Sequence, residues 1–550
     1  MAQGIEASIE STAGGAAAAP SVTSRVARNA MWLGVGGVTI VAGAFLVHQL
    51  MAWPPHEDET LALFVGRDSL PGVVEHVTRD RGGAPLHFLV AWAVAHLGFG
   101  LGGLRLASAA FALGSLPLVA LLGRRLAGPA VALVATAIFA SSWLFLFHGV
   151  YGRMYSLFLL CSLACTLALL GALERGGRAR WALWVLAALL TVATHPYGVL
   201  LLGGQGAYVL AMRRDRLRAA VLAGCAVLVL GTPFWLTDLV LADRFDVGVG
   251  GGGERLGGPG AVARYLWRSA GDASAGWWPV TAAVVVAAAA GVVLLGREAR
   301  ALVLCLVGVT VAAFALARLG GSASPESRHL IFLAPLFAIA VGTSLVHVGR
   351  RRPAVAAALL AALVVADVSW AWHRTSALFD WEPDARQAAR AEAERWLAAT
   401  SRPDDVLFGY EPLYLGAWER NRAFPTTVVP RADARLALQT LRRAGRLGRG
   451  VWVLDASERN NIRPQLEIEY RVPTPPALFQ VRVFGPFLVV RTFEPVVTPK
   501  AFLYDAARTM LVGQQLGIGD ADVNVRTAVL AERERSGYGP SLRSRSSNSR

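Results

Sequence analysis

The sequence WPPHEDET (Trp53–Thr60) places three acids directly after a long apolar segment. That segment, residues 31–52, holds no Asp, Glu, Lys or Arg and is about long enough to cross a bilayer once as a helix. The acids therefore stand where a first transmembrane helix leaves the membrane. Carboxylates cost little there because they stay hydrated, and they can reach a polar group held at the lipid surface. The side of the membrane that these acids face decides how the rest of the chain is read.

The composition is that of a membrane protein with many spans. Apolar residues make up 54% of the 550 residues, the mean hydropathy is +0.46, and apolar segments recur as far as residue 372. The net charge of +15 is carried almost entirely by arginines in short clusters between these segments. We attribute it to membrane topology and expect no nucleic-acid partner. The cysteines all lie in apolar segments and are expected to be small buried residues without disulfides: Cys161, Cys165, Cys225 and Cys305.

Hydropathy predicts about eleven transmembrane helices. They lie at 31–52, 104–123, 129–147, 154–173, 181–194, 197–212, 217–236, 278–296, 301–317, 329–347 and 353–373. If the N-terminus is cytoplasmic, the alternate loops that face the cytoplasm carry the arginine clusters at 124–125, 175–180, 213–218, 297–300 and 350–352, as cytoplasmic loops usually do. The segment from Pro85 to Leu97 must then not cross, and its shortness and two histidines favour a re-entrant or interfacial helix.

This topology places the chain in the plasma membrane with a cytoplasmic N-terminus and an extracytoplasmic C-terminus. Five polar sites then fall on the external face: Glu57–Glu59, Asp80 with His87, the turn 148–155, the break 194–197, and 326–329. Polar groups that converge at one membrane surface are a candidate active site.

At these residues the chain resembles the GT-C superfamily of membrane glycosyltransferases, and most closely the branch of protein O-mannosyltransferases (family 39) and aminoarabinose transferases. The resemblance is an ordered set of motifs over roughly residues 31–375, of which no single one is specific. Its members are Asp58-Glu59 in the first external loop, Pro85-Leu86, the turn Arg153-Met154-Tyr155, the break Thr194-His195-Pro196-Tyr197, and Arg328-His329-Leu330.

The resemblance implies a sugar donor on a polyprenyl phosphate and an acceptor that arrives from outside, either a glycan or a protein. Asp58 is then the candidate general base for an acceptor hydroxyl, and Glu59 would orient it or raise its pKa by like-charge repulsion. Asp80 is the next catalytic candidate. Arg153 and Arg328 would hold the leaving phosphate. The remaining candidate substrate-binding residues are Tyr155, His195, Tyr197 and His329.

Two departures from the family pattern concern mechanism. Relatives often have His-Pro-Pro-Leu where this chain has Gly83-Ala84-Pro85-Leu86, and many carry a glutamate shortly before the Arg-Met-Tyr turn, where this chain has Tyr151. Without that second carboxylate a paired-acid metal site is in doubt. No cofactor is assigned, and a divalent cation such as Mg²⁺ or Mn²⁺ stays open. One strong candidate base fits an inverting displacement better than a retaining mechanism with two close carboxylates.

Simpler interpretations stand beside these roles. Asp80 can pair with Arg79 or Arg81, and Arg153 can extend its head group to the interface. The His195-Pro196 pair is also compatible with a plain turn between helices, and Arg328 with an ion pair to Glu326.

Hydropathy falls after His373, and strands then alternate with helices. Helical spacing appears at 385–400 and 432–444, and strand patterns at 404–410, 451–455 and 481–493. We therefore expect a small extracytoplasmic α/β domain. The expected organisation is a disordered cytoplasmic N-terminus at 1–30, a multi-span domain at 31–373, the α/β domain at 374–531, and a disordered tail at 532–550.

The sequence thus predicts a glycosyltransferase that moves a sugar, such as mannose or another hexose or pentose, from a polyprenyl-phosphate donor to a cell-envelope glycan or protein. Two alternatives remain. A polytopic transporter or flippase of lipid carriers would more often place its charges near the membrane midplane in paired repeats, which are not evident here. A non-catalytic GT-C scaffold that binds lipid carriers is compatible with Tyr151.

Overall fold

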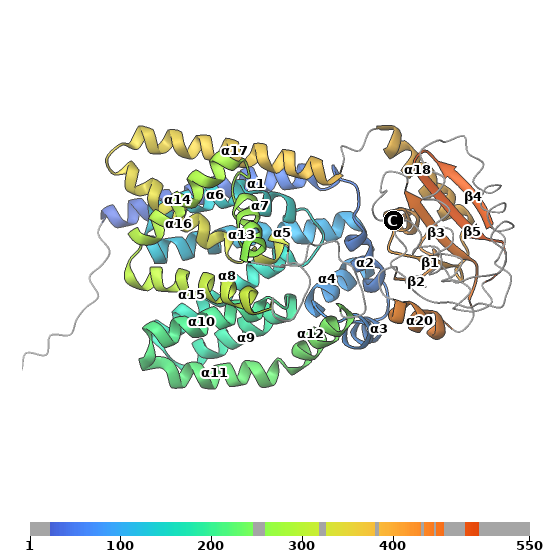
Figure 1. Ribbon diagram of the computed structural model, residues 1–550, viewed down its shortest axis with the longest axis horizontal. Coiled ribbons are helices and arrows are strands. Elements are labelled where there is room, and N and C mark those ends of the chain that lie inside the picture. Colours follow the sequence, from blue (N-terminus) through green and yellow to red (C-terminus); the bar gives the residue numbers. More distant parts are fainter. Residues whose placement is uncertain are drawn as a thin grey trace, which may run out of the picture.

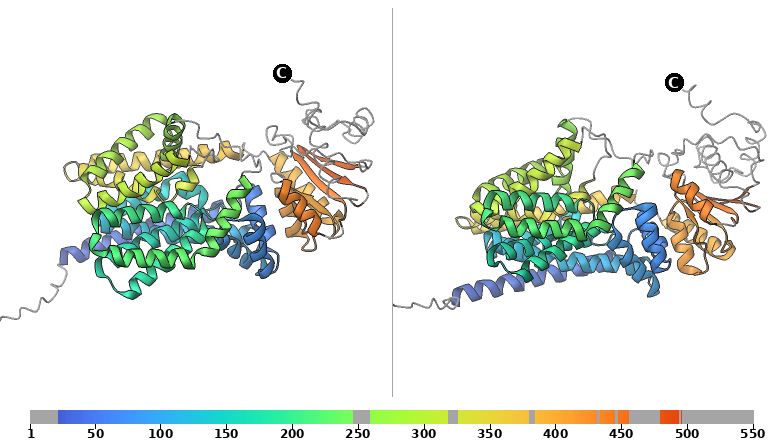
Figure 2. Two further views of the ribbon diagram at one scale, coloured as in Figure 1. Left: turned by 60° about the horizontal axis from the view of Figure 1, so that its bottom comes forward. Right: turned by 90° about the horizontal axis from the view of Figure 1, so that it is seen from below.

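The computed structural model describes residues 22–245, 259–317, 326–379, 384–430, 434–444, 447–455, 479–493 and 495. A long helical bundle carries a smaller α/β domain beyond one of its ends (Figure 1). The same arrangement is seen in two further views (Figure 2). Most of the predicted N-terminal region 1–30, and the whole of the predicted tail 532–550, lie outside the described residues.

Each of the eleven predicted apolar segments is helical. The helices are α1 (Val22–Gln49), α5 (Leu101–Ala127), α6 (Pro129–Ser141) with α7 (Trp143–His148), α8 (Tyr155–Arg175), α9 (Arg178–Thr194), α10 (Gly198–Met212), α11 (Leu217–Leu230) with α12 (Thr232–Phe245), α14 (Trp278–Leu294), α15 (Arg297–Ala317), α16 (Ala334–Gly349) and α17 (Pro353–Phe379). A further helix, α13 (Pro259–Asp272), precedes α14.

Fewer of these helices are long and apolar enough to cross a membrane alone. Among the described residues five qualify: Asn29–Gln49, Leu101–Ala127, Tyr155–Arg175, Ser327–Gly349 and Pro353–Ser376. The pair Arg214–Leu230 and Thr232–Leu241, bent by 61°, would make a sixth. Several other helices are apolar but shorter, among them Gly198–Met212 and Trp278–Leu294. By length and composition, therefore, five or six helices among the described residues could each cross a membrane. All eleven predicted segments nevertheless pack together in one bundle (Figure 1).

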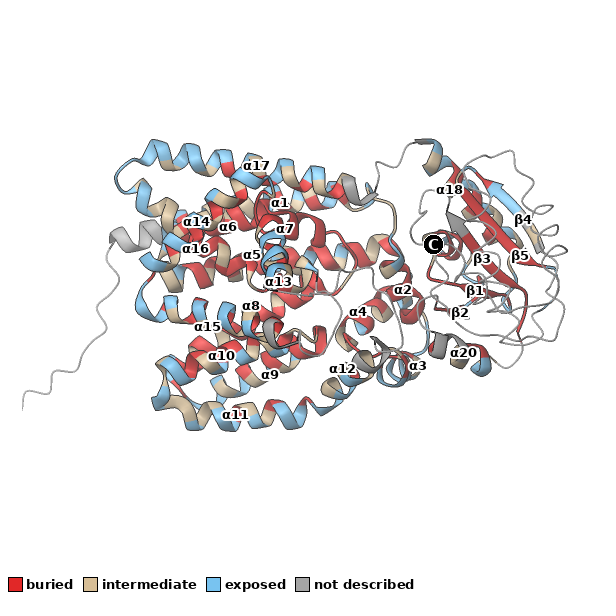
Figure 3. Ribbon diagram, in the orientation of Figure 1, coloured by how far each residue is buried: buried red, intermediate tan, exposed pale blue. Residues whose placement is uncertain are grey.

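The outer face of the bundle is apolar. Leu33 is 79% exposed on α1, Val229 71% on α11 and Val365 69% on α17. Figure 3 shows exposed residues along the outer faces of α11, α15 and α17, with buried residues between the helices. Exposed apolar rows of this kind suit a lipid surrounding. Cys225 on α11 belongs to this exposed face and Cys305 on α15 is only partly buried, so the expectation of burial is wrong for Cys225 and met only in part by Cys305; all four thiols are free.

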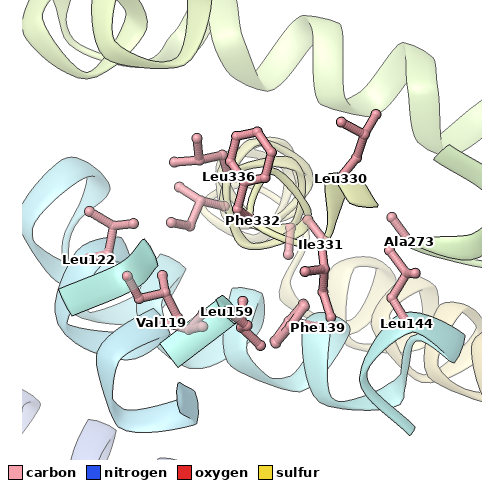
Figure 4. Packing of buried hydrophobic residues seen from close by; sticks show 14 of the residues in the cluster. Val119, Leu122, Phe139, Leu144, Leu159, Ala273, Leu330, Ile331, Phe332 and Leu336 are labelled. Carbon is pink, nitrogen blue, oxygen red and sulfur yellow. The ribbon is translucent and has the colours of Figure 1, made fainter. Parts of the chain in front are cut away.

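The bundle core lies between α5, α6, α8 and the start of α16. Val119, Phe139, Leu159 and Phe332 are all nearly inaccessible and converge there (Figure 4). Small residues let neighbouring helices approach closely: a Cβ added to Gly291 on α14 would lie 1.8 Å from the Ala340 carbonyl oxygen on α16. This tight packing holds the ends of the helices, and therefore the loops between them, in fixed positions.

Three short helices and one π-helical turn separate the bundle from the α/β domain. They are α2 (Glu57–Gly66), α3 (Leu70–Glu75), η1 (His76–Arg81) and α4 (Pro85–His96), which lie between the two parts in Figure 1. The segment predicted not to cross is thus a twelve-residue helix packed against α2. A shared buried cluster continues into the α/β domain, where Phe64 lies 6.3 Å from Trp418 between ring centroids.

The α/β domain holds one five-stranded sheet in the order β2-β1-β3-β5-β4. Its elements are α18 (Asp384–Thr400), β1 (Val406–Phe408), α19 (Pro412–Arg420), β2 (Val428–Val429), α20 (Ala434–Arg443), β3 (Gly450–Asp455), β4 (Phe479–Phe484) and β5 (Phe487–Thr492). Strand β1 pairs in parallel with β2 and β3, while β5 pairs antiparallel with β3 and β4. The predicted helices and strands of this region are confirmed; α19 and β2 were not predicted.

The predicted arginine clusters and the α/β domain lie at opposite ends of the bundle. At the end away from the domain, Arg125 at the end of α5 donates to Glu174 on α8, and Arg213 donates to the Leu173 carbonyl oxygen. At the other end, the Leu101 amide that opens α5 donates to Glu419 of α19 at 2.7 Å. The arrangement is the one that the arginine-based topology requires.

Candidate active site

The acidic stretch after α1 folds as the first turn of α2. His56 is the N-cap: its Nδ1 accepts the Asp58 amide at 3.1 Å, and the Glu59 carboxylate accepts the His56 amide at 3.0 Å. This reciprocal capping satisfies amide donors that a helix start leaves free. The acids also lie at the positive end of the helix dipole, which stabilises them. The two neighbouring carboxylates are nevertheless directed to different partners.

Asp58 faces a group of cationic and phenolic side chains. Tyr151 donates its hydroxyl to the carboxylate at 2.8 Å. Arg153 approaches the same oxygen to 3.7 Å and Arg328 to 3.9 Å. Three parts of the chain that are distant in sequence therefore meet at one carboxylate: the start of α2, the turn before α8, and η3 (Ser327–Leu330).

These cations decide the protonation of Asp58. Burial raises the pKa of this carboxyl, but the charges of Arg153, His56 and Arg328 and the Tyr151 hydrogen bond outweigh burial and hold the pKa well below its ordinary value. Asp58 is therefore ionised at neutral pH. The expectation that Glu59 raises this pKa by like-charge repulsion is wrong, because the cations around Asp58 dominate.

Glu59 is fully buried in an ion pair with Arg105. Arg105 donates to both carboxylate oxygens at 2.8 and 2.7 Å, and the two side chains are 2% and 0% exposed. The Gly152 amide donates to the same carboxylate at 2.8 Å. The remaining Arg105 donors bind the carbonyl oxygens of Leu50, Trp53 and Pro54. Glu59 thus joins the end of α1 to the turn that carries Tyr151 and Arg153.

Arg328 and His329 are presented by η3. Arg328 donates to Glu326 at 2.8 Å, so the ion pair considered from the sequence exists alongside the approach to Asp58. Its guanidinium also lies over the Tyr155 ring at 5.2 Å. Helix α13 also contacts the η3 turn. Tyr265 on α13 donates to the Glu326 carbonyl oxygen, and Ser327 donates to Asp272 at the end of α13 at 2.6 Å.

Four aromatic rings from three loops adjoin the arginines. The His195 and His329 centroids are 5.3 Å apart, and Tyr197 lies 5.2 Å from each of them. Tyr155 lies 5.9 Å from His195 and 6.0 Å from His329. The structure therefore brings together all six predicted substrate-binding residues and Asp58.

Asp80 is placed elsewhere, at the boundary with the α/β domain. Its carboxylate is bound by Arg443 and by Gln439 of α20, with His76 3.4 Å away on the preceding turn of η1. Burial raises its pKa, but the His76 and Arg443 hydrogen bonds and charges lower it more. The structure thus gives Asp80 an interface role, and its partner is Arg443 instead of the Arg79 or Arg81 considered from the sequence.

Three contributors were not predicted as site residues: His56, Arg105 and Tyr151. Arg105 had a usable signal, because an arginine near the start of the apolar segment 104–123 needs a buried acidic partner. Tyr151 was noted only as a missing carboxylate. Its position shows that a phenol binds Asp58 where a second acid was expected.

The residues around Asp58 do not fit a divalent cation. Such an ion prefers several oxygen ligands, including more than one carboxylate or carbonyl group. Here the single carboxylate faces two guanidinium groups, and no cluster of three or more His, Cys, Asp or Glu side chains suited to a metal occurs in the described part of the chain.

Comparison with known proteins supports the fold. No family model matches the sequence, and no curated protein matches it. Among solved structures, ArnT from Cupriavidus metallidurans in the apo state aligns with a TM-score of 0.56 at 16% identity, covering 84% of this chain and 98% of ArnT. The same protein bound to undecaprenyl phosphate aligns with a TM-score of 0.50 at 14% identity, covering 86% and 98%.

An oligosaccharyltransferase from Archaeoglobus fulgidus, crystallised with Zn and sulfate, aligns more weakly, with a TM-score of 0.46 at 13% identity over 77% of this chain and 68% of its own. The alignment with ArnT extends through nearly all of that chain. It shows that the present chain shares the fold of ArnT, which is the GT-C fold that the motif order indicated.

Proposed function

We propose that this protein is a glycosyltransferase that moves a sugar from a polyprenyl-phosphate donor to an acceptor outside the cell. The observation that carries the proposal is the pair of guanidinium groups at Asp58. Arg153 and Arg328 approach the carboxylate only to 3.7 and 3.9 Å, and the buried Nε of each makes no hydrogen bond within the described residues. Buried donors without acceptors are costly, and a phosphate would satisfy them.

The comparison supports the same ligand class. One of the ArnT structures that share this fold is bound to undecaprenyl phosphate. In a bundle whose outer face is apolar, the lipid tail of such a donor would remain in the bilayer while its phosphate reaches the loops at the bundle end. The arginines adjoin Asp58 at that end.

The proposed reaction is a displacement at the anomeric carbon. The acceptor oxygen forms a bond to that carbon, the bond from the carbon to the phosphate oxygen breaks, and polyprenyl phosphate leaves with the electron pair. Arg153 and Arg328 stabilise the charge that gathers on the phosphate. Asp58 takes the proton when the acceptor is a hydroxyl group. A single direct displacement inverts the configuration of the sugar.

The low pKa of Asp58 makes it a weak base until donor binds. A phosphate bound by Arg153 and Arg328 would partly neutralise these cations and add a negative charge near the carboxylate. Both changes raise the pKa of Asp58, because less positive charge stabilises its ionised form. Donor binding would therefore strengthen the base at the moment when the sugar is in place.

Glu59, Asp80 and the aromatic residues have different proposed roles. Glu59 positions the site by fixing the turn before Arg153 through Arg105 and Gly152. Asp80 binds Arg443 and so holds the α/β domain against η1 and the short helices beside it. Tyr155, His195, Tyr197 and His329 contact the donor beside the arginines.

The site is proposed to face the outside of the plasma membrane. The arginine clusters at the opposite end of the bundle support a cytoplasmic location for that end. A cysteine introduced at Ser69 or Thr426 should be labelled from outside in spheroplasts, and one introduced at Arg214 should not. Since Cys225 is exposed on α11, a background chain with Cys225→Ala is the control. Labelling of a cysteine at position 214 from outside would contradict the proposed topology and favour the opposite orientation in the membrane.

Comparison of envelope glycans tests the function. Mass spectrometry of glycans and glycoproteins, with and without the gene product, should reveal one sugar that is lost and that returns with the wild-type chain but not with Asp58→Asn. The purified chain should then transfer that sugar from its polyprenyl-phosphate form. Unchanged glycans, together with normal glycolipid movement by Asp58→Asn protein in vesicles, would favour a transporter and reject the enzyme.

A further inference from the structure

Two loops of the site each contain a hydrogen bond from a backbone amide to the Nδ1 atom of a histidine ring. The Tyr197 amide donates to Nδ1 of His195 at 3.1 Å, and the Glu326 amide donates to Nδ1 of His329 at 3.1 Å. Each amide belongs to the same turn as the ring that it binds. A ring nitrogen that accepts from an amide carries no proton, so the proton of each neutral imidazole must be on Nε2.

Two separate turns therefore fix the same tautomer. His195 opens the break between α9 and α10, whereas His329 belongs to η3 before α16. The two rings nevertheless lie 5.3 Å apart, with Tyr155 and Tyr197 beside them. In the described part of the chain, neither Nε2 makes a hydrogen bond. The result is two neighbouring N–H donors whose direction is set by backbone geometry.

The surroundings keep these rings neutral. Burial, together with the positive charges of Arg328 and Arg153, lowers the pKa of His195 to about 3. Protonation at Nδ1 would also break the bond from the Tyr197 amide. A neutral imidazole cannot supply a charge to the site, but it can donate one hydrogen bond to an oxygen that the arginines attract.

We propose that His195 and His329 are a pair of neutral Nε2–H donors, held by their turns, that bind oxygens of the phosphate whose charge Arg153 and Arg328 neutralise. This assignment rests on the proposed function and specifies how the same site recognises its donor. The two rings act as hydrogen-bond donors and not as general acids, since polyprenyl phosphate leaves as a stable anion and needs no proton.

The structure suggests a matched pair of substitutions for each ring. Asparagine places its Oδ1 near the position of Nδ1, so it preserves the bond to the backbone amide and removes the distal donor. Glutamine places its amide nitrogen near the position of Nε2, so it preserves the donor and removes the acceptor in the turn. His347→Asn, on an exposed position at the far end of α16, is the control for the same change of residue type.

The experiment measures binding of undecaprenyl phosphate to the purified full chain in detergent, with undecaprenol as the phosphate-free control. We expect His195→Asn and His329→Asn to melt like the wild type and to bind the phosphate about 10-fold or more weakly, the usual consequence of losing a hydrogen bond to a charged group. The Gln variants should bind within a few fold of wild type in their folded fraction. Undecaprenol affinity should not change in any variant.

The opposite pattern would overturn the assignment. If the Asn variants bind undecaprenyl phosphate like the wild type and only the Gln variants lose binding because they unfold, the two histidines only stabilise their turns and do not bind phosphate. If the wild-type chain binds undecaprenyl phosphate no better than undecaprenol, the proposed donor class fails and this assignment fails with it. Nitrogen-15 spectra of labelled histidine, compared with those of the His195→Asn chain, give an independent check: a proton on Nδ1 of His195 would reject the proposal without reference to any lipid.

Discussion

The two ends of the helical bundle use arginine in different ways. At the end away from the α/β domain, Arg216 is 39% exposed and its partner Asp215 60% exposed. At the other end, Arg105 is 2% exposed and Arg153 12% exposed, and both contact acids of α2. Exposed ion pairs contribute little to stability, whereas a buried pair leaves an uncompensated charge when one partner is removed. Arginine therefore forms exposed ion pairs at one end of the bundle and buried ones at the candidate site at the other end.

The largest effect is expected at Asp58. Asp58→Asn is nearly isosteric, so the chain should fold, but sugar transfer should fall by roughly two to four orders of magnitude because the general base is lost. Glu57→Gln changes an exposed neighbour in the same helical turn and should retain most activity. Initial rates with purified proteins at saturating donor check this. Near-normal turnover by Asp58→Asn would contradict the assignment of the base.

The next effect compares a fully buried arginine, Arg105, with a partly exposed one, Arg125. Arg105→Ala leaves the Glu59 carboxylate buried without its cation and should destabilise the fold by about 3–5 kcal/mol. Arg125→Ala, at the far end of the same helix, should cost about 0–1 kcal/mol. Thermal and denaturant unfolding in detergent compare the two. Equal losses would show that burial of the Glu59 pair contributes little.

A smaller effect is expected from a change of cation shape. Arg328→Lys keeps the charge but loses the planar fork, so the KM for the donor should rise about 10-fold while the KM for the acceptor stays unchanged. Arg328→Ala should raise the KM for the donor further, because the positive charge is lost as well.

Glu326→Gln separates the phosphate role of Arg328 from a structural one. This change removes the local ion pair but keeps the guanidinium near Asp58. If Glu326→Gln and Arg328→Ala both lower the melting temperature, and the folded fraction of each keeps normal specific activity, Arg328 serves the fold and not the donor.

The smallest effect concerns pH. The folded-state pKa of Asp58 is lowered, so its contribution to stability is fully present above the unfolded pKa of about 4 and is lost as pH falls through the lower folded value. Arg153→Gln should raise the folded pKa and shrink this contribution. The difference in melting temperature between wild type and Arg153→Gln should therefore be constant from pH 7 to about 5 and narrow only below about pH 4, as the pH falls through the folded-state pKa of Asp58 in the variant toward the lower value in the wild type. If Arg153→Gln melts at the same temperature as the wild type at neutral pH, Arg153 does not stabilise ionised Asp58.

The sequence by itself determined the helices and the regions from which the site is built. Hydropathy located eleven apolar segments, each of which is helical, because lipid requires long apolar runs and this signal is local; it did not locate α13. Local strand patterns located four of the five strands: a turn into a strand at 404–410, an apolar run at 451–455, and alternation at 481–493. The motif order placed Asp58, Arg153, His195 and Arg328 at loops on one side of the bundle, and these residues do meet in the structure.

Only the tertiary structure decided what each acid does. Asp58, Glu59 and Asp80 look alike in sequence, but their partners come from residues that are distant along the chain: Arg153 and Arg328, Arg105, and Arg443. The pKa of a carboxyl group depends on burial and on charges a few ångströms away, and hydropathy carries no information about either. The histidine tautomers are likewise set by backbone amides of their turns, whose geometry exists only after the helices pack.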